Sequence, residues 1–225
     1  KWVAFASSRG SRGLAWFRKA ANGAGEEEIL IRPGKSATPG SWSPDGRFML
    51  FNDASTPADI FAIDLGSRPQ GGGEPKLQPL VSSPGNDVQP RFSPDGHWFS
   101  YASNESGRIE AYVRPFDPSS ATPASGGRWQ ISKGGATFGG ALWRGDGKEL
   151  FYVSADGDMM SVAVSTKPTF QAEEPKLLFK APPGTTFYDV SADGKRFLIP
   201  VPTGSAAGVA PPYKVILNWT STLRK

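Results

Sequence analysis

The sequence predicts an all-β protein, a β-propeller built from four-stranded antiparallel blades. Three observations support this prediction: a composition rich in turn formers, a turn motif that recurs about every fifty residues, and short apolar stretches at even spacing around that motif. The 225 residues include 27 glycines and 21 prolines, which suit turns and disfavour long helices. Seven tryptophans and fourteen phenylalanines supply the bulky side chains that a folded core needs.

The recurring motif is a Ser-Pro-Asp-Gly turn or a close variant of it. Its aspartates are spaced by 50, 51 and 47 residues, and they are Asp45, Asp95, Asp146 and Asp193. Asp-Gly favours a tight turn because glycine adopts positive φ freely and aspartate tolerates it. The third copy has Arg144 and Gly145 in place of Ser-Pro, and the fourth has Ser191 and Ala192. Because all copies keep Asp-Gly, each repeat is predicted to contain a β-hairpin there.

Each repeat has room for four short strands in a meander. In the third repeat we expect them at residues 89–92, 98–102, 110–116 and 129–131, and we expect matching third strands at 59–65 and 159–164 in its neighbours. Apolar runs such as FMLF (48–51) and ELFYV (149–153) lack the strict alternation of a sheet with one wet face. Both faces of these strands must therefore be covered, as they are where each propeller blade packs between two others.

The repeats divide the chain into five blades of a single propeller domain: residues 1–36, 37–84, 85–134, 135–182 and 183–225. The first blade has strand-like segments at 2–6, 14–18 and 29–32 but no innermost strand, and the last has segments at 187–190, 196–201 and 213–219 but no clear fourth. We expect upstream sequence to complete the ring, or the five blades to form an open arc. Unpaired edges in the two incomplete blades favour self-association between chains.

The turn followed by an aromatic and apolar strand resembles the repeat of TolB-like propellers. Three stretches are similar to the propeller region found C-terminal to bacterial serine/threonine protein kinases: LWRGDGKELFYVSADGDMMSVAV (142–164), FYDVSADGKRFLI (187–199) and VILNW (215–219). The resemblance covers nearly the whole chain. It implies a bacterial source and an extracytoplasmic position, periplasmic or at the cell surface, beyond a membrane anchor outside this segment. No kinase motif is present in the sequence itself.

Composition and charge exclude several classes of function. With no cysteine and one histidine, the chain has no disulfide, no thiolate metal site and no pair of histidine ligands. Its net charge of +4 is too mild to predict nucleic-acid binding, and no apolar run approaches the roughly 18–20 residues that span a bilayer. We expect no metal, no cofactor, no nucleic-acid partner and no membrane insertion by this segment.

Single motifs that suggest chemistry are better explained by the repeat. His97 occupies a hairpin position that carries Arg or Lys in the other repeats, so we expect a solvated side chain and no catalytic role. The RGD tripeptide at 144–146 is the repeat's own turn, and SADGD at 154–158 lacks the further carboxylates of a calcium loop. No Gly-x-Ser-x-Gly elbow occurs, and no catalytic residue is predicted.

Propeller geometry places a candidate site at the mouth of the central channel, where the loops that lead into the innermost strands converge. These loops are expected at residues 85–91, 134–140 and 183–189. The candidate ligand-binding residues are Asp87, Gln89, Arg91, Thr137, Phe138 and Tyr188. The same residues would also serve as turn and packing residues around a water-filled channel.

These observations favour a non-enzymatic binding or sensor module that presents a propeller face to a protein or a small-molecule ligand. The resemblance implies that it could be the sensor part of a bacterial serine/threonine kinase. The alternative is the propeller domain of a hydrolase or lyase, with the catalytic part absent or placed in the channel. A TolB-like envelope scaffold is a third hypothesis. Fold alone does not choose between them.

Overall fold

The computed structural model describes residues 2–7, 15–31, 37–67, 76–119 and 127–201, and these residues form a series of antiparallel sheets. The first sheet contains β1 (Trp2–Ser7), β2 (Ala15–Ala20) and β3 (Glu28–Ile31). The second contains β4 (Ala37–Trp42), β5 (Phe48–Asp53), β6 (Ile60–Asp64) and β7 (Lys76–Val81). A short 3-10 helix, η1 (Leu65–Ser67), follows β6.

The third and fourth sheets repeat this meander. The third contains β8 (Asp87–Phe92), β9 (Trp98–Ser103), β10 (Glu110–Pro115) and β11 (Trp129–Gln130). The fourth contains β12 (Leu142–Trp143), β13 (Glu149–Val153) and β14 (Asp158–Ser165), and both β15 (Gln171–Ala172) and β16 (Lys176–Lys180) pair with β14. The last sheet contains β17 (Asp189–Val190) and β18 (Phe197–Leu198). The predicted all-β architecture of antiparallel blades is confirmed.

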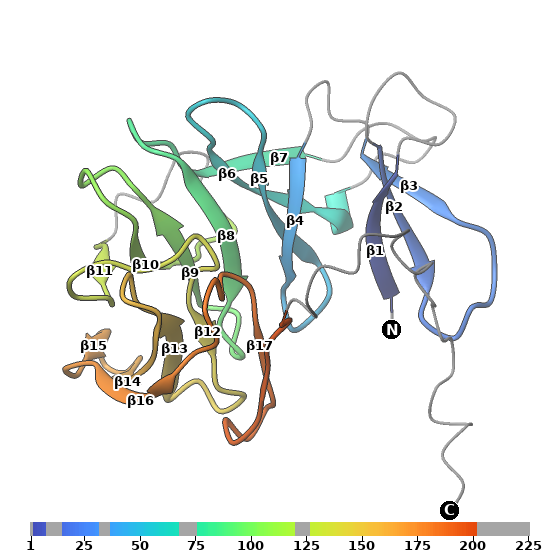
Figure 1. Ribbon diagram of the computed structural model, residues 1–225. Coiled ribbons are helices and arrows are strands. Elements are labelled where there is room, and N and C mark those ends of the chain that lie inside the picture. The colour runs from blue at the N-terminus through green and yellow to red at the C-terminus, as the bar shows by residue number, and fades with distance from the viewer. Residues whose placement is uncertain (1, 8–14, 32–36, 68–75, 120–126, 202–225) are drawn as a thin grey trace, which may run out of the picture.

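The first strands of the second to fifth sheets lie in the middle of the molecule. Figure 1 shows β4, β8, β12 and β17 near the centre, with β11, β15 and β16 at the periphery. The approach of β4 to β8 is close: a Cβ atom on Gly40 would lie 2.5 Å from the carbonyl oxygen of Pro90. A side chain at this position would force the two inner strands apart, so glycine permits their contact.

The core is divided among the interfaces between successive sheets. Strand β5 shows the principle, since Phe48 and Leu50 pack toward the third sheet while Met49 and Phe51 pack toward the first. Strand β13 repeats it, with Leu150 against the third sheet and Phe151 against the last. Burying one such side chain stabilises the fold by about 1.5–3 kcal/mol. The prediction that both faces of these strands are covered is confirmed.

The Ser-Pro-Asp-Gly turns share one hydrogen-bond pattern. In the third sheet the Ser93 hydroxyl donates to Asp95 Oδ1 at 2.5 Å and accepts from the Trp98 amide at 3.0 Å. Asp95 Oδ1 also accepts from the His97 amide at 3.1 Å. Gly96 adopts φ 73°, the left-handed conformation that glycine reaches without strain. The turns at Ser43 and Ser191 repeat these contacts.

The turn of the fourth sheet has arginine in place of serine and closes by different chemistry. Arg144 donates from Nε and Nη2 to the two carboxylate oxygens of Asp146, at 2.8 and 2.9 Å, and from Nη1 to Glu149 Oε2 at 2.6 Å. These bonds, chiefly those from Arg144, lower the pKa of Asp146 to about 2. Asp146 still accepts from the Lys148 amide at 3.0 Å, so the backbone geometry of the turn is kept.

The predicted strands agree with the observed ones except near the C-terminus. Strand β18 covers only two residues of the predicted 196–201 segment. The predicted strand at 213–219 lies outside the described residues. Within the described ranges, the structure has no helix long and apolar enough to span a membrane.

Candidate functional site

A cavity of about 320 Å³ lies among the inner strands, and its lining has the periodicity of the repeat. The residues that occur four positions before each turn aspartate all contribute to it: Ser41, Arg91, Leu142 and Asp189. The residues one position further on, which are mostly aromatic, contribute as well: Trp42, Phe92, Trp143 and Val190. The cavity is therefore built by equivalent positions of the second to fifth sheets, beside their inner strands, and we call it the central cavity.

Arg91 is the cation of this cavity. Its Nη1 donates to the carbonyl oxygen of Gly40 at 2.5 Å, and its Nη2 lies 3.4 Å from Gln89 Oε1. Its Nε is buried and has no hydrogen-bond partner. Burial lowers the pKa of the guanidinium, while the negative charge of Asp189 acts in the opposite direction. Arginine remains protonated in proteins, so the cavity carries a fixed positive charge with unused donors.

An irregularity in β8 determines the direction of Arg91. The pairing of β8 with β9 shifts register between Val88 and Arg91. Gln89, inside this bulge, adopts φ 55° and is the one non-glycine residue with positive φ in the described part of the chain. Its amide donates to Asn52 Oδ1 of the second sheet at 3.3 Å. A bulge changes the side of the sheet on which the following side chains lie. Here Arg91, which follows the bulge, lines the cavity.

Asp87 lies at the start of β8 and is fully buried. Burial raises the pKa of its carboxyl group, although the hydroxyls of Ser103 and Ser83 lie near enough to oppose the shift. Neither carboxylate oxygen has a hydrogen bond of good geometry. Asp87 was predicted to bind a ligand at the channel mouth, but a ligand in solvent could not contact this buried side chain without movement of the surrounding chain.

The other candidate residues have packing contacts of their own. Thr137 Oγ1 lies 3.4 Å from the carbonyl oxygen of Thr186, and Phe138 is half-buried beside it. The Tyr188 hydroxyl lies 2.6 Å from the carbonyl oxygen of Phe151 and 3.2 Å from that of Gly140, and burial raises its pKa. Of the six candidates, Arg91 alone lines the central cavity.

Sequence reasoning missed Ser41, Leu142 and Asp189 as partners of Arg91 in this lining. The signal was present in the sequence, because all four residues precede a turn aspartate by four positions. The prediction used the loops before the inner strands instead. The cavity lies beside the strands that follow those loops.

The acidic groups of two other motifs, SADGD and RGD, contact cationic side chains of the same chain. In SADGD, the Lys180 ammonium lies 3.1 Å from Asp158 Oδ1 and donates to the carbonyl oxygen of Asp156 at 2.6 Å. In RGD, the arginine and the aspartate bind each other. His97 is exposed, as predicted. Within the described ranges, no group of three or more acidic or histidine side chains could hold a metal ion.

A second cavity, of about 360 Å³, lies between the turns of the third and fourth sheets. Its two carboxylates belong to Asp95 and Asp146. Both carboxylates already accept the hydrogen bonds that close their own turns. We therefore take the central cavity as the candidate site.

Comparison with solved structures identifies the architecture. The chain matches TolB from Acinetobacter baumannii with a TM-score of 0.63 and 20% identity, over 88% of this chain and 45% of that one. It matches a protein assigned as TolB from Agrobacterium tumefaciens with a TM-score of 0.61 and 19% identity, over 89% of this chain and 71% of that one. The chain has the fold of a TolB-like β-propeller. The resemblance to TolB-like propellers found in the sequence is thereby confirmed at the level of the fold.

The TolB-like fold is shared by proteins with other activities. A gluconolactonase from Xanthomonas campestris matches with a TM-score of 0.53 and 13% identity, over 83% of this chain and 65% of that one. No family profile matches the chain, and no curated protein does. At these identities the similarity shows the fold alone, and function must be argued from the site.

Proposed function

We propose that this chain is a non-enzymatic binding module that holds a ligand in its central cavity. One observation carries the proposal: equivalent positions of the four sheets line a single cavity, and one of them is an arginine with an unused buried donor. Burying a donor without a partner costs about 1–3 kcal/mol. An anionic group of a ligand or of a protein segment would compensate the guanidinium charge and would bind through Nη2, whose contact with Gln89 is long.

We further propose that the module acts outside the cytoplasm, as the sensor part of a serine/threonine kinase. The support is the similarity of residues 142–164 and 187–199 to kinase-associated propellers. The flanking gene sequence tests this context directly. A kinase domain followed by a transmembrane helix upstream of Lys1 is the expected result, and a hydrolase domain or a stand-alone propeller would contradict it.

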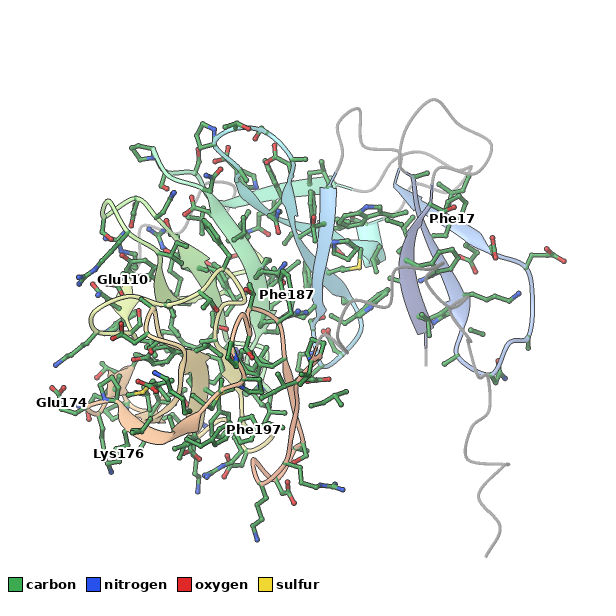
Figure 2. All side chains as sticks on the ribbon, in the orientation of Figure 1. Phe17, Glu110, Glu174, Lys176, Phe187 and Phe197 are labelled. Atoms are coloured by element: carbon green, nitrogen blue, oxygen red, sulfur yellow. The ribbon has the colours of Figure 1, made fainter. Side chains whose placement is uncertain are left out.

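Binding itself is tested with a panel of ligands and a matched pair of variants. Thermal unfolding is measured with small carboxylates, amines, amino acids, sugars and short peptides, and a pull-down probes extracytoplasmic proteins. A ligand of the cavity should stabilise the wild-type protein and have no effect on Arg91→Gln. The control is Lys133→Gln, because Lys133 is exposed and pairs with Glu174 at the outer edge of the fourth sheet. Figure 2 shows Glu174 at this edge. Equal stabilisation of wild type and Arg91→Gln would contradict the proposal.

The alternative is an enzyme, a hydrolase or lyase whose reaction occurs in the same cavity. The observation that favours it is the presence of the exposed Asp189 carboxylate beside Arg91, since a base and a cation in one cavity can support proton transfer and charge stabilisation. Asp87 is too deeply buried for this role. Hydrolysis of lactone or peptide substrates that disappears in Asp189→Asn would establish the enzyme, and activity equal to that of buffer would exclude it for those substrates.

A further inference from the structure

Arg91 and Asp189 bring opposite charges to one cavity without forming an ion pair. They belong to different sheets, since Arg91 lies in β8 and Asp189 begins β17, and both line the central cavity. Asp189 influences the titration of Arg91, so the two charges lie within electrostatic reach of each other. A ligand between them could therefore contact both.

Each of the two groups retains unused hydrogen-bonding capacity. Arg91 uses one strong bond, to Gly40, while its contact with Gln89 is long and its Nε has no partner. Asp189 uses Oδ1 to accept from the Val190 amide at 2.8 Å, and its side chain is exposed. A guanidinium binds a carboxylate through two parallel N–H donors, and a carboxylate binds an ammonium group through charge-assisted hydrogen bonds.

Apart from Ser41 and Ser93, the remaining walls of the cavity are apolar. Trp42, Phe92 and Trp143 contribute aromatic surface, and the Trp143 indole nitrogen donates to the carbonyl oxygen of Arg91 at 3.3 Å. The volume of about 320 Å³ is at the lower end of the roughly 300–1,000 Å³ of small-molecule sites. The cavity therefore suits a small molecule with an apolar part and two charged ends.

We propose that the central cavity binds a small zwitterion, an α-amino acid with an apolar side chain, whose carboxylate contacts Arg91 and whose ammonium group contacts Asp189. The aromatic walls contact the apolar side chain. This inference rests on the proposed binding function and names its ligand class. A simple anion would satisfy Arg91 and leave Asp189 unpaired, and a simple amine would do the reverse. The two charges together select a molecule that carries both.

Titration calorimetry with three matched probes tests the proposal. L-phenylalanine carries both charges, 3-phenylpropionate carries the carboxylate alone, and 2-phenylethylamine carries the ammonium group alone. Only L-phenylalanine should bind well, with each truncated probe weaker by about ten- to hundredfold, the usual value of a charged hydrogen bond. Leucine serves as an aliphatic amino acid of similar charge and should also bind.

Variants assign the two charges to the two ends of the probe. Arg91→Gln and Asp189→Asn should each lower the affinity for L-phenylalanine by about tenfold or more. The controls Lys133→Gln and Glu174→Gln should leave this affinity unchanged. Asp189→Asn should not weaken the binding of 3-phenylpropionate, because that probe has no ammonium group and the lost negative charge no longer repels its carboxylate. If Arg91→Gln proves unfolded by circular dichroism, the exposed Asp189 variant still decides the test.

Two results would overturn the inference in distinguishable ways. If no amino acid binds while another ligand stabilises the wild type and not Arg91→Gln, the binding function stands and the zwitterion is wrong. If no ligand discriminates between wild type and Arg91→Gln, both fail. If L-phenylalanine binds Arg91→Gln and Asp189→Asn as tightly as the wild type, its site lies elsewhere and the inference is rejected.

Discussion

Asp87 has neither solvent access nor a hydrogen bond of good geometry at either carboxylate oxygen. Because burial favours the neutral form, its pKa is raised above the ordinary value of 3.8. Between the unfolded and folded pKa values the folded state binds more protons, so stability falls as the pH rises through this interval. At neutral pH the charged carboxylate therefore opposes folding.

Replacing this carboxylate by its neutral isostere should stabilise the protein. We expect Asp87→Asn to raise the free energy of unfolding at about pH 7, by about 1 kcal/mol, with a smaller gain at about pH 4 where the wild-type group is already partly neutral. Urea unfolding at the two pH values measures both differences. A loss of stability at neutral pH would show instead that the Ser83 and Ser103 hydroxyls stabilise the charged form.

At the same scale, Asp87 shows why a site residue is harder to predict than a strand. The sequence placed Asp87 and Arg91 in one loop that leads into an inner strand, and both were expected at the channel mouth. The register shift between Val88 and Arg91 separates their environments, so one is buried and the other lines the cavity. Such a bulge depends on contacts with neighbouring sheets, here the bond from the Gln89 amide to Asn52, which no local pattern contains.

At the scale of the element, the turn serine has a structural function that its sequence motif only indicates. Ser93 is buried, donates to Asp95 and accepts from the Trp98 amide. We expect Ser93→Ala to lower the free energy of unfolding by about 1–2 kcal/mol, because it leaves the partly buried Trp98 amide without its acceptor.

The control for this turn is Ser119→Ala. Ser119 also donates to an aspartate, Asp117 at 2.7 Å, but this bond is exposed. Its removal should cost no more than about 0.5 kcal/mol. Chemical denaturation of both variants provides the comparison, and equal losses would mean that the repeat motif adds nothing beyond an ordinary surface turn.

The hairpins could be predicted from sequence because their determinants are local. Asp-Gly sets the turn, and the apolar runs on either side set the strands. Strands β9 and β13 accordingly begin and end within a residue or so of the predicted segments. Strand β18 is shorter than predicted, and it pairs with β17 over two residues.

At the scale of the whole molecule, the last sheet is held close to the fourth by a glycine. A Cβ atom on Gly139 would lie 1.8 Å from the carbonyl oxygen of Thr186, a distance that only a backbone shift could relieve. We expect Gly139→Ala to destabilise the protein by about 1–3 kcal/mol, the usual cost of overpacking, and to increase amide exchange in the last sheet first.

The matched control is Gly66→Ala. Its added Cβ would meet only the flexible ends of Arg47 and Asp64, the nearest at 3.2 Å. Hydrogen exchange followed by mass spectrometry measures both variants. If the last sheet of Gly139→Ala stays as protected as in the wild type, the close approach does not hold the two sheets together.

The last two sheets also leave an apolar surface exposed. Leu177 of β16 and Leu198 of β18 are 62% and 75% exposed, and the rings of Phe179 and Phe197 join the two strands at 5.3 Å. We predict concentration-dependent self-association through this surface. Sedimentation velocity should show that it is abolished by Leu177→Lys with Leu198→Lys.

Leu77→Lys serves as the control for this surface. Leu77 is 46% exposed on β7, in a different blade, so its change should leave association intact. Identical sedimentation of the wild type and the double variant over a wide range of concentrations would count against an interface at the last blades.

The arginine that replaces serine makes the closure of the turn in the fourth sheet sensitive to ionic strength, whereas the equivalent turns are closed by a serine hydroxyl. Screening weakens the attraction between Arg144 and the carboxylates of Asp146 and Glu149, all partly exposed, but has little effect on a serine hydroxyl bond. In concentrated salt the fourth hairpin should therefore be the first of the four to open. The repeat has kept the shape of its turn while changing the solvent conditions under which one copy is stable.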